Sequence, residues 1–282
     1  MSHPPRRIDH AVFAVHDLEA AALFYRRLGF QVRARNRHPW GTENRLIQFG
    51  TSFIELITMG PEAEAISDFE PGRFSFGGFV RDYLSRREGF AMLALQSEDA
   101  KADAAAFARE GLGACEPFSF ERTGHRPDGS EAPLAFTLAF AQPPGAPPAG
   151  FFTCQHHFPQ NFWNPLLQRH ENGASAIAEV GLLAAHPQRY QDFLCALSRS
   201  CAERSDRGGL SIRLRDARLT VASVEPVEAD LQLHSVTIRV PDLLAQADRL
   251  EKGRVAFAAT RTGLGIPAES AFGVAIRFAP RR

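Results

Sequence analysis

The sequence has no excess of charge of either sign, since 32 Lys and Arg balance 32 Asp and Glu among its 282 residues. It therefore lacks the basic surplus with which general nucleic-acid binders neutralise phosphates. Four cysteines without a C-x-x-C pair do not indicate a disulfide framework, so we expect a reducing compartment. Neither a secretory signal nor an apolar run of about 18 residues is present. We expect a soluble, cytoplasmic protein without nucleic-acid or membrane partners.

Several catalytic signatures are also missing. The sequence contains no G-x-G-x-x-G, P-loop, G-x-S-x-G or H-E-x-x-H pattern, which disfavours dinucleotide binding, phosphoryl transfer, α/β-hydrolase and zinc-protease chemistry. Polar aromatic residues are scarce, with 23 Phe against 3 Tyr and 2 Trp. Phenylalanine rings without polar groups predict an apolar core or pocket, and favour a partly apolar substrate.

The first 60 residues follow a βαβββ order. Residues 8–15 form an apolar, strand-like run, and Asp17 can cap a helix that ends at Gly29. Three more strand-like runs follow, at residues 30–34, 44–49 and 51–58.

The same order recurs from residues 89, 176 and 233, and such internal repetition is the strongest organisational signal in the chain. The fold class expected is α+β, with repeated βαβββ modules paired into two cup-shaped, mixed-sheet domains. We place the first domain at residues 1–160, a linker at 161–173 and the second domain at 174–282.

Two chemically competent residues lie on predicted strands of the first module. His10 is in the middle of its strand, and Glu55 interrupts the apolar run Phe-Ile-Glu-Leu-Ile. A carboxylate on a buried strand is costly unless it is paired, hydrogen-bonded or metal-bound. Imidazole and carboxylate together suit Zn, Fe, Ni or Mn. A structural pair between Glu55 and an Arg or His is the alternative.

Residues 8–19, followed by Phe24, Tyr25 and the Leu-Gly-Phe of 28–30, resemble the first module of the vicinal-oxygen-chelate superfamily. That superfamily contains glyoxalase I, extradiol dioxygenases and bleomycin-resistance proteins. Residues 233–243 resemble the same opening strand in the last module. Four shorter segments are similar to the branch of glyoxalase-like domain proteins, namely residues 38–45, 155–157, 163–165 and 170–173.

The resemblance implies metal positions that can be transferred one by one. In the first module they fall on His10 and Glu55. In the second they fall on Phe90, which cannot coordinate, and on Gln155, a poor ligand, while His157 two residues later should share the strand face of Gln155. The expected site is one divalent metal (Zn, Ni, Mn or Fe) on His10, Glu55 and His157.

In the third and fourth modules the corresponding positions are Val180 and Ser235, which lack ligand chemistry. The second domain is therefore expected to be metal-free and chemically silent, a structural or dimerising half, and we expect a homodimer.

A predicted loop adds candidate substrate-binding residues. His38, Thr42, Asn44 and Arg45 can present hydrogen-bond donors at the mouth of the first cup, with Trp163 as a wall. The alternative is that the loop residues only bond their own backbone.

Phe90 and Gln155 are expected to line the same cup, with Phe90 narrowing it. Cys154 is expected to point away from it.

The resemblance implies a glyoxalase-like enzyme of lyase, isomerase or dioxygenase type. Its substrate would be a small, partly apolar molecule with a carbonyl or enol group, with His10 and Glu55 as the catalytic pair. The alternative is a metal-free protein that binds or sequesters a small molecule, as bleomycin-resistance proteins do. Because this fold hosts many activities, the fold alone does not identify the reaction.

Overall fold

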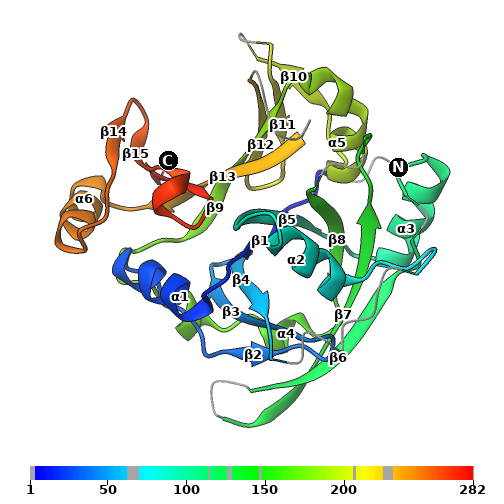
Figure 1. The fold of residues 1–282 in the computed structure, drawn as a ribbon, viewed down its shortest axis with the longest axis horizontal. Helices are drawn as coiled ribbons and strands as arrows, with labels where there is room; N and C mark the ends of the chain where they lie inside the picture. The colour runs from blue at the N-terminus through cyan, green and yellow to red at the C-terminus, as the bar shows by residue number, and fades with distance from the viewer. Residues whose placement is uncertain are drawn as a thin grey trace.

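A computed structural model of the chain describes residues 4–61, 70–113, 115–125, 129–145, 148–205, 208–224 and 231–281. Its strands form two eight-stranded mixed sheets (Figure 1), one within residues 8–156 and one within residues 176–280. The α+β class with two cup-shaped sheets, expected from the repeats, is confirmed. The exact division at residues 160 and 174 stays a prediction.

The first sheet has the order β2-β3-β4-β1-β5-β8-β7-β6. Two pairs are parallel, β1 with β4 and β5 with β8, and β1 joins the two modules by pairing antiparallel with β5. The strands are β1 (Ile8–Ala14), β2 (Asn36–Arg37), β3 (Thr42–Gln48), β4 (Phe53–Met59), β5 (Gly89–Gln96), β6 (Phe118–His125), β7 (Glu131–Ala141) and β8 (Gly150–His156).

The second sheet repeats this topology in the order β10-β11-β12-β9-β13-β16-β15-β14. Its parallel pairs are β9 with β12 and β13 with β16, and β9 joins the modules by pairing antiparallel with β13. The strands are β9 (Ala176–Ala184), β10 (Ala202–Arg204), β11 (Leu210–Arg213), β12 (Arg218–Ser223), β13 (Leu231–Val240), β14 (Ala258–Thr260), β15 (Gly263–Ile266) and β16 (Ala275–Pro280).

Several helices begin where the sequence supplies caps. Asp17 accepts hydrogen bonds from the backbone N–H groups of Glu19 and Ala20, and Asp99 and Asp242 cap two other helices in the same way. The helices are α1 (Leu18–Arg27), α2 (Phe76–Leu84), α3 (Ala100–Arg109), α4 (Pro159–Phe162), α5 (Gln191–Ser198) and α6 (Leu243–Lys252), with 3-10 turns η2 (Pro165–Gln168), η3 (Pro187–Tyr190) and η4 (Ala268–Ser270). No helix in the described ranges is long and apolar enough to cross a membrane.

One expected strand is missing from the first module. Residues 30–34 are irregular, and the strand at that edge of the sheet is the short β2 instead. In the run 30–34, the N–H of Arg33 donates to the carbonyl of Leu46. Phe30 is nonetheless buried in the core, so its hydrophobicity marks burial rather than a regular strand.

The concave face of the first sheet is filled. Helix α2 lies inside the curve of the sheet (Figure 1), and its Phe76, Val80 and Tyr83 join an apolar cluster with Val12 and Phe152 from the strands. The convex faces of both sheets, together with α1, α3, α5 and α6, share one continuous core.

A buried charge cluster also joins the two halves. Asp103 on α3 accepts a hydrogen bond from Arg6 at 2.5 Å and another from Arg199, just after α5, at 2.7 Å. Ser97 and Thr153 donate to the other oxygen of the same carboxylate. These bonds outweigh the effect of burial, which alone would raise the pKa of Asp103, and hold that pKa below its ordinary value.

Candidate active site

His10 and Glu55 meet in the first cup. They lie on the parallel strands β1 and β4, and His10 Nε2 is 3.8 Å from Glu55 Oε2, with each residue about 6 % exposed. Because side chains alternate along a strand, Val12 faces the cup with His10, and Phe53 and Ile57 face it with Glu55. The structure thus brings the two residues that the resemblance implied to one cavity, whereas their roles stay proposals.

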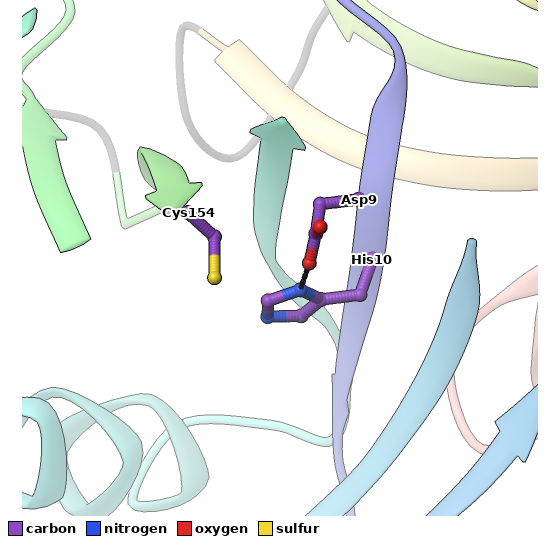
Figure 2. Close-up of side chains that lie close together, drawn as sticks. All are labelled: Asp9, His10 and Cys154. Atoms are coloured by element: carbon purple, nitrogen blue, oxygen red, sulfur yellow. Dashed lines mark hydrogen bonds and ion pairs between the residues drawn. The ribbon is translucent and has the colours of Figure 1, made fainter. Parts of the chain in front are cut away.

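Asp9 fixes the orientation of the His10 ring. The Asp9 carboxylate is fully buried and lies 2.6 Å from His10 Nδ1 (Figure 2), and its other oxygen is 2.9 Å from His156 Nε2. Neighbouring residues on a strand normally face opposite sides. Here the pairing of β1 with β5 shifts between Ile8 and His10, and this irregularity lies where the two neighbours come together.

The charge of Asp9 is stabilised in place. Burial alone would raise the pKa of Asp9, but attraction to His156 and hydrogen bonds from His10 and His156 hold the pKa well below its ordinary value. A carboxylate at Asp9 accepts the Nδ1 proton of His10, so Nε2 of a neutral His10 carries a lone pair towards Glu55. Two acceptor atoms then face each other, and a proton or a cation between them relieves the repulsion.

The second oxygen of Glu55 is contacted by polar side chains that lie on β3 and in the turn before it. Asn44 Nδ2 donates to Glu55 Oε1 at 2.5 Å, and His38 Nε2 is 3.8 Å from the same oxygen. On its other side, His38 Nδ1 is 2.8 Å from Thr42 Oγ1. Burial lowers the pKa of His38, although attraction to Glu55 opposes that effect. Buried Thr42 thus supports His38 and does not itself line the cup.

These polar groups end in a cavity of about 50 Å³ with largely apolar walls. That volume holds a few water-sized groups. Arg122 on β6 also lines the cavity, and burial lowers its pKa, opposed by attraction to Glu55. The remaining lining residues are Trp40, Leu46, Phe53, Phe76, Phe120, Phe136, Leu138, Phe152, Cys154 and Phe162.

Cys154 points into the cup, so the expectation that it faces away is wrong. Phe152 and Cys154 face the cavity, whereas Phe151 belongs to the core on the other face of β8. Burial, followed by the negative charges of Asp9 and Glu55, raises the pKa of the Cys154 thiol. Figure 2 shows this thiol directed towards His10, and donor atoms of Asp9, His10 and Cys154 all lie within 4.8 Å of one another.

Two candidates from the end of β8 lie elsewhere. Gln155 Oε1 accepts a hydrogen bond from the N–H of Ala100 on the convex side, and His157 Nε2 pairs with Thr137 Oγ1 at 2.8 Å outside the cavity. The structure therefore does not bring His157 to the pair of His10 and Glu55. The sequence analysis assigned Gln155 and His157 to the concave face of β8, one residue out of phase. A shift of one residue exchanges the two faces of a strand, so both residues lie on the opposite side.

Phe90 also misses the cup. Its ring packs edge-to-face on Phe13 at 5.0 Å in the shared convex core. The concave positions of β5 include Met92 and Ala94, which offer no donor of the oxygen or nitrogen type. The second module therefore contributes Cys154 to the cavity wall, where a histidine or glutamate was expected.

The last two candidates lie around the site but not in it. Arg45 turns outward and forms an ion pair with Glu19 at 2.8 Å. Trp163 stacks on His156 at 5.7 Å and contacts Phe53 edge-on at 6.1 Å, so it covers the Asp9 side of the site from behind. The sequence analysis did not assign Asp9, His156 or Arg122 to the site. Asp9 could have been found, because it is a carboxylate within an otherwise apolar strand.

A family model described as a glyoxalase-like domain matches residues 8–197. The chain belongs to this family. The matched range contains the whole first sheet and the beginning of the second half. No protein in the search of curated proteins matches.

Solved structures share the glyoxalase-like fold over the full chain. A hypothetical protein from Staphylococcus aureus aligns with a TM-score of 0.69 at 16% identity, covering 98% of this chain and 100% of its own. A variant of 4-hydroxymandelate synthase from Streptomyces coelicolor aligns with a TM-score of 0.62 at 15% identity, covering 99% and 94%. The Mn(II)-bound glyoxalase from Novosphingobium aromaticivorans aligns with a TM-score of 0.60 at 12% identity, covering 98% and 82%.

Together the family match and these neighbours confirm membership in the vicinal-oxygen-chelate superfamily. At such low identity the neighbours establish the fold of this glyoxalase-like protein and leave its reaction to the site.

Proposed function

We propose that the first cup is the active site of a metal-dependent enzyme that acts on a small, partly apolar molecule with a carbonyl or enol group. The observation that carries the proposal is the facing pair of His10 Nε2 and Glu55 Oε2, 3.8 Å apart in an apolar cavity. Two acceptors held this way, with the histidine fixed by Asp9 from behind, form a site for a cation or a transferred proton.

The residues present fit a divalent metal. His10 Nε2 and Glu55 Oε2, 3.8 Å apart, would hold it, and Asp9 would orient His10 through Nδ1. An imidazole nitrogen and a carboxylate oxygen together suit Zn, Fe, Ni or Mn. When bound, the metal supplies a Lewis acid that polarises a carbonyl oxygen.

The side chains of the chain supply the proton chemistry and the binding. Glu55 is the proton-transfer base, and Asn44 holds its carboxylate in place through a 2.5 Å hydrogen bond. Arg122 is the cation in the cavity wall that can face a substrate oxygen. The aromatic walls exclude water and contact the apolar part of the substrate. Proton transfer favours the lyase and isomerase types over the dioxygenase type.

Metal content tests the proposal. We expect about one transition metal per chain after purification without chelator, and about a tenfold lower content in His10→Ala and Glu55→Gln. His157→Ala is the matched control, because this histidine lies outside the cavity, and it should keep the metal. No bound metal after supplementation with Zn, Ni, Mn or Fe(II) would contradict the proposal.

Proton exchange tests the role of Glu55. The wild-type protein should exchange the C3 protons of small aromatic 2-oxo acids, which lie next to the keto group, with deuterated solvent, and NMR follows this exchange. Glu55→Gln should slow this exchange by about 10²–10⁴-fold, the usual contribution of a positioned base. Arg45→Gln, a change at the outward-facing ion pair, should leave it unchanged.

One observation favours a second candidate, a metal-free binding protein. Asn44 satisfies one Glu55 oxygen without any metal, and the cavity of about 50 Å³ is small. If this candidate holds, small aromatic carbonyl compounds bind with equal affinity in Glu55→Gln and wild type, in calorimetry with chelator present. A cytoplasmic location and a homodimer remain part of the proposal.

A further inference from the structure

The concave face of the second sheet is open and rich in arginine. On β12, Leu219 points into the convex core while Arg218 faces the opposite side, and Ile276 and Arg277 alternate in the same way on β16. Because alternate residues share a face, the charged side chains of several strands gather on one surface of this sheet.

The register aligns them in a row. Arg213 is the Cα partner of Arg218, Arg218 of Glu179, Glu179 of Thr237, and Thr237 of Arg277. Arg218 and Arg277 are three strand spacings apart, about 14 Å at the Cα atoms. The long side chains of Arg218 and Arg277 can therefore reach one small molecule placed above Glu179 and Thr237, which lie between them.

A cavity of about 1040 Å³ lies over this row. Six arginines line it, Arg213, Arg215, Arg218, Arg239, Arg261 and Arg277, against two carboxylates, Glu179 and Asp216.

The two carboxylates do not neutralise the arginines. Asp216 accepts a hydrogen bond from Thr51 at 2.9 Å and lies 3.8 Å from Arg7, whereas Glu179 accepts a hydrogen bond from Thr220. In the part of the chain that the structure describes, none of the six lining arginines forms an ion pair with a carboxylate.

We propose that this face, the arginine cup, binds a small organic anion that carries two or more phosphate or carboxylate groups. Guanidinium groups bind both kinds of group in bidentate geometry, and a multivalent anion relieves the repulsion among neighbouring arginines. The cavity is at the upper end of the size of small-molecule pockets. Thr237 and Glu179 on its floor provide a hydroxyl and an acceptor for a hydroxyl group of the ligand.

A small anion fits these observations better than the larger alternatives. The surface is a concave sheet face rather than an extended basic stripe, and the chain as a whole has no net charge, which disfavours a nucleic acid. The arginine cup lies on a different sheet from His10 and Glu55, so the proposal does not depend on metal binding or catalysis there. It replaces the expectation of a chemically silent second half.

Calorimetric titration with pyrophosphate and with citrate, at 0.05 M NaCl, tests the proposal. The wild type should bind one or both probes with saturation at one per chain, and more weakly at 0.5 M NaCl because salt screens the attraction. The double variant Arg218→Gln with Arg277→Gln should lower the affinity at least tenfold. The control pair is Arg86→Gln with Arg109→Gln, two exposed arginines outside the cavity, and it should bind as the wild type does.

The probes also separate the two chemical classes, since preference for pyrophosphate indicates phosphate esters and preference for citrate indicates polycarboxylates. Circular dichroism spectra that match the wild type show that the variants are folded. The proposal is overturned if neither probe saturates, or if both double variants lose affinity equally. It is also overturned if sedimentation shows a dimer that dissociates in Arg218→Gln with Arg277→Gln, or if a single-stranded oligonucleotide binds in place of the probes.

Discussion

The two sheets have the same strand order and equivalent parallel pairs, yet their concave faces differ in how closed and how charged they are. In the first cup the face is closed by α2 and by aromatic rings around a few buried polar tips. In the second the face is open and lined by arginines. Strand topology alone therefore does not determine what such a cup can bind. The side chains that point from the strands into the concave face determine the ligand.

The first cup is closed because the connection between its two modules is long. Residues 60–88 connect β4 to β5 and include α2, whereas residues 224–230 connect the equivalent strands β12 and β13. The longer connection supplies apolar side chains that cover the face. Buried charges in the first cup must then be paired, while charges in the second remain hydrated.

The largest contrast should come from removing one carboxylate from each cup. Asp9→Ala should lower the free energy of unfolding by about 3–5 kcal/mol, because it leaves buried His10 and His156 without their partner. Glu179→Ala in the open cup should change it by less than about 0.5 kcal/mol. Equilibrium unfolding in urea measures both. Equal effects would show that the first cup is not closed to water.

Truncation of an uncharged residue on each concave face comes next. Phe152 is fully buried, so Phe152→Ala should cost about 3–4 kcal/mol through lost burial and the cavity left behind. Thr237→Ala should stay within about 0.5 kcal/mol. The same urea titrations provide the test, and a cost below about 1 kcal/mol at Phe152 would contradict the packing of the first cup.

A smaller difference should appear in the pH dependence of stability. The pKa of His38 is lowered from 6.5 in the folded chain, so the unfolded chain takes up this proton first and stability falls as the pH drops below 6.5. His38→Gln should flatten that fall between pH 7.5 and 5.5. His186→Gln, at an exposed histidine of the second half, should keep the wild-type slope. An unchanged slope in His38→Gln would show that the histidine is accessible to water.

The smallest effect concerns repulsion in the arginine cup. Arg213 and Arg218 are direct cross-strand partners, and like charges in such positions destabilise a sheet. Arg213→Gln should therefore raise the free energy of unfolding by about 0.2–0.5 kcal/mol at 0.05 M NaCl, and the gain should vanish at 0.5 M NaCl. A loss of stability at both salt concentrations would indicate that the arginine holds the sheet together.

The sequence by itself determined the order of the modules, and its resemblance to the vicinal-oxygen-chelate superfamily pointed to His10 and Glu55 as one site. Local rules suffice for the modules. Aspartate caps and turn glycines mark the helices, and a period of two along a strand fixes which residues share a face.

Only the tertiary structure decided the rest of the site. The contact of Asp9 with His10 depends on how β1 pairs with β5, about 80 residues away. The choice of Cys154 over Gln155 depends on which face of β8 turns inward, and one residue of register reverses it. Arg122 lines the same cavity as Glu55 although β6 and β4 are not neighbours in the strand order of the first sheet. Pairing and curvature are set by contacts between distant segments, and local sequence patterns do not contain them.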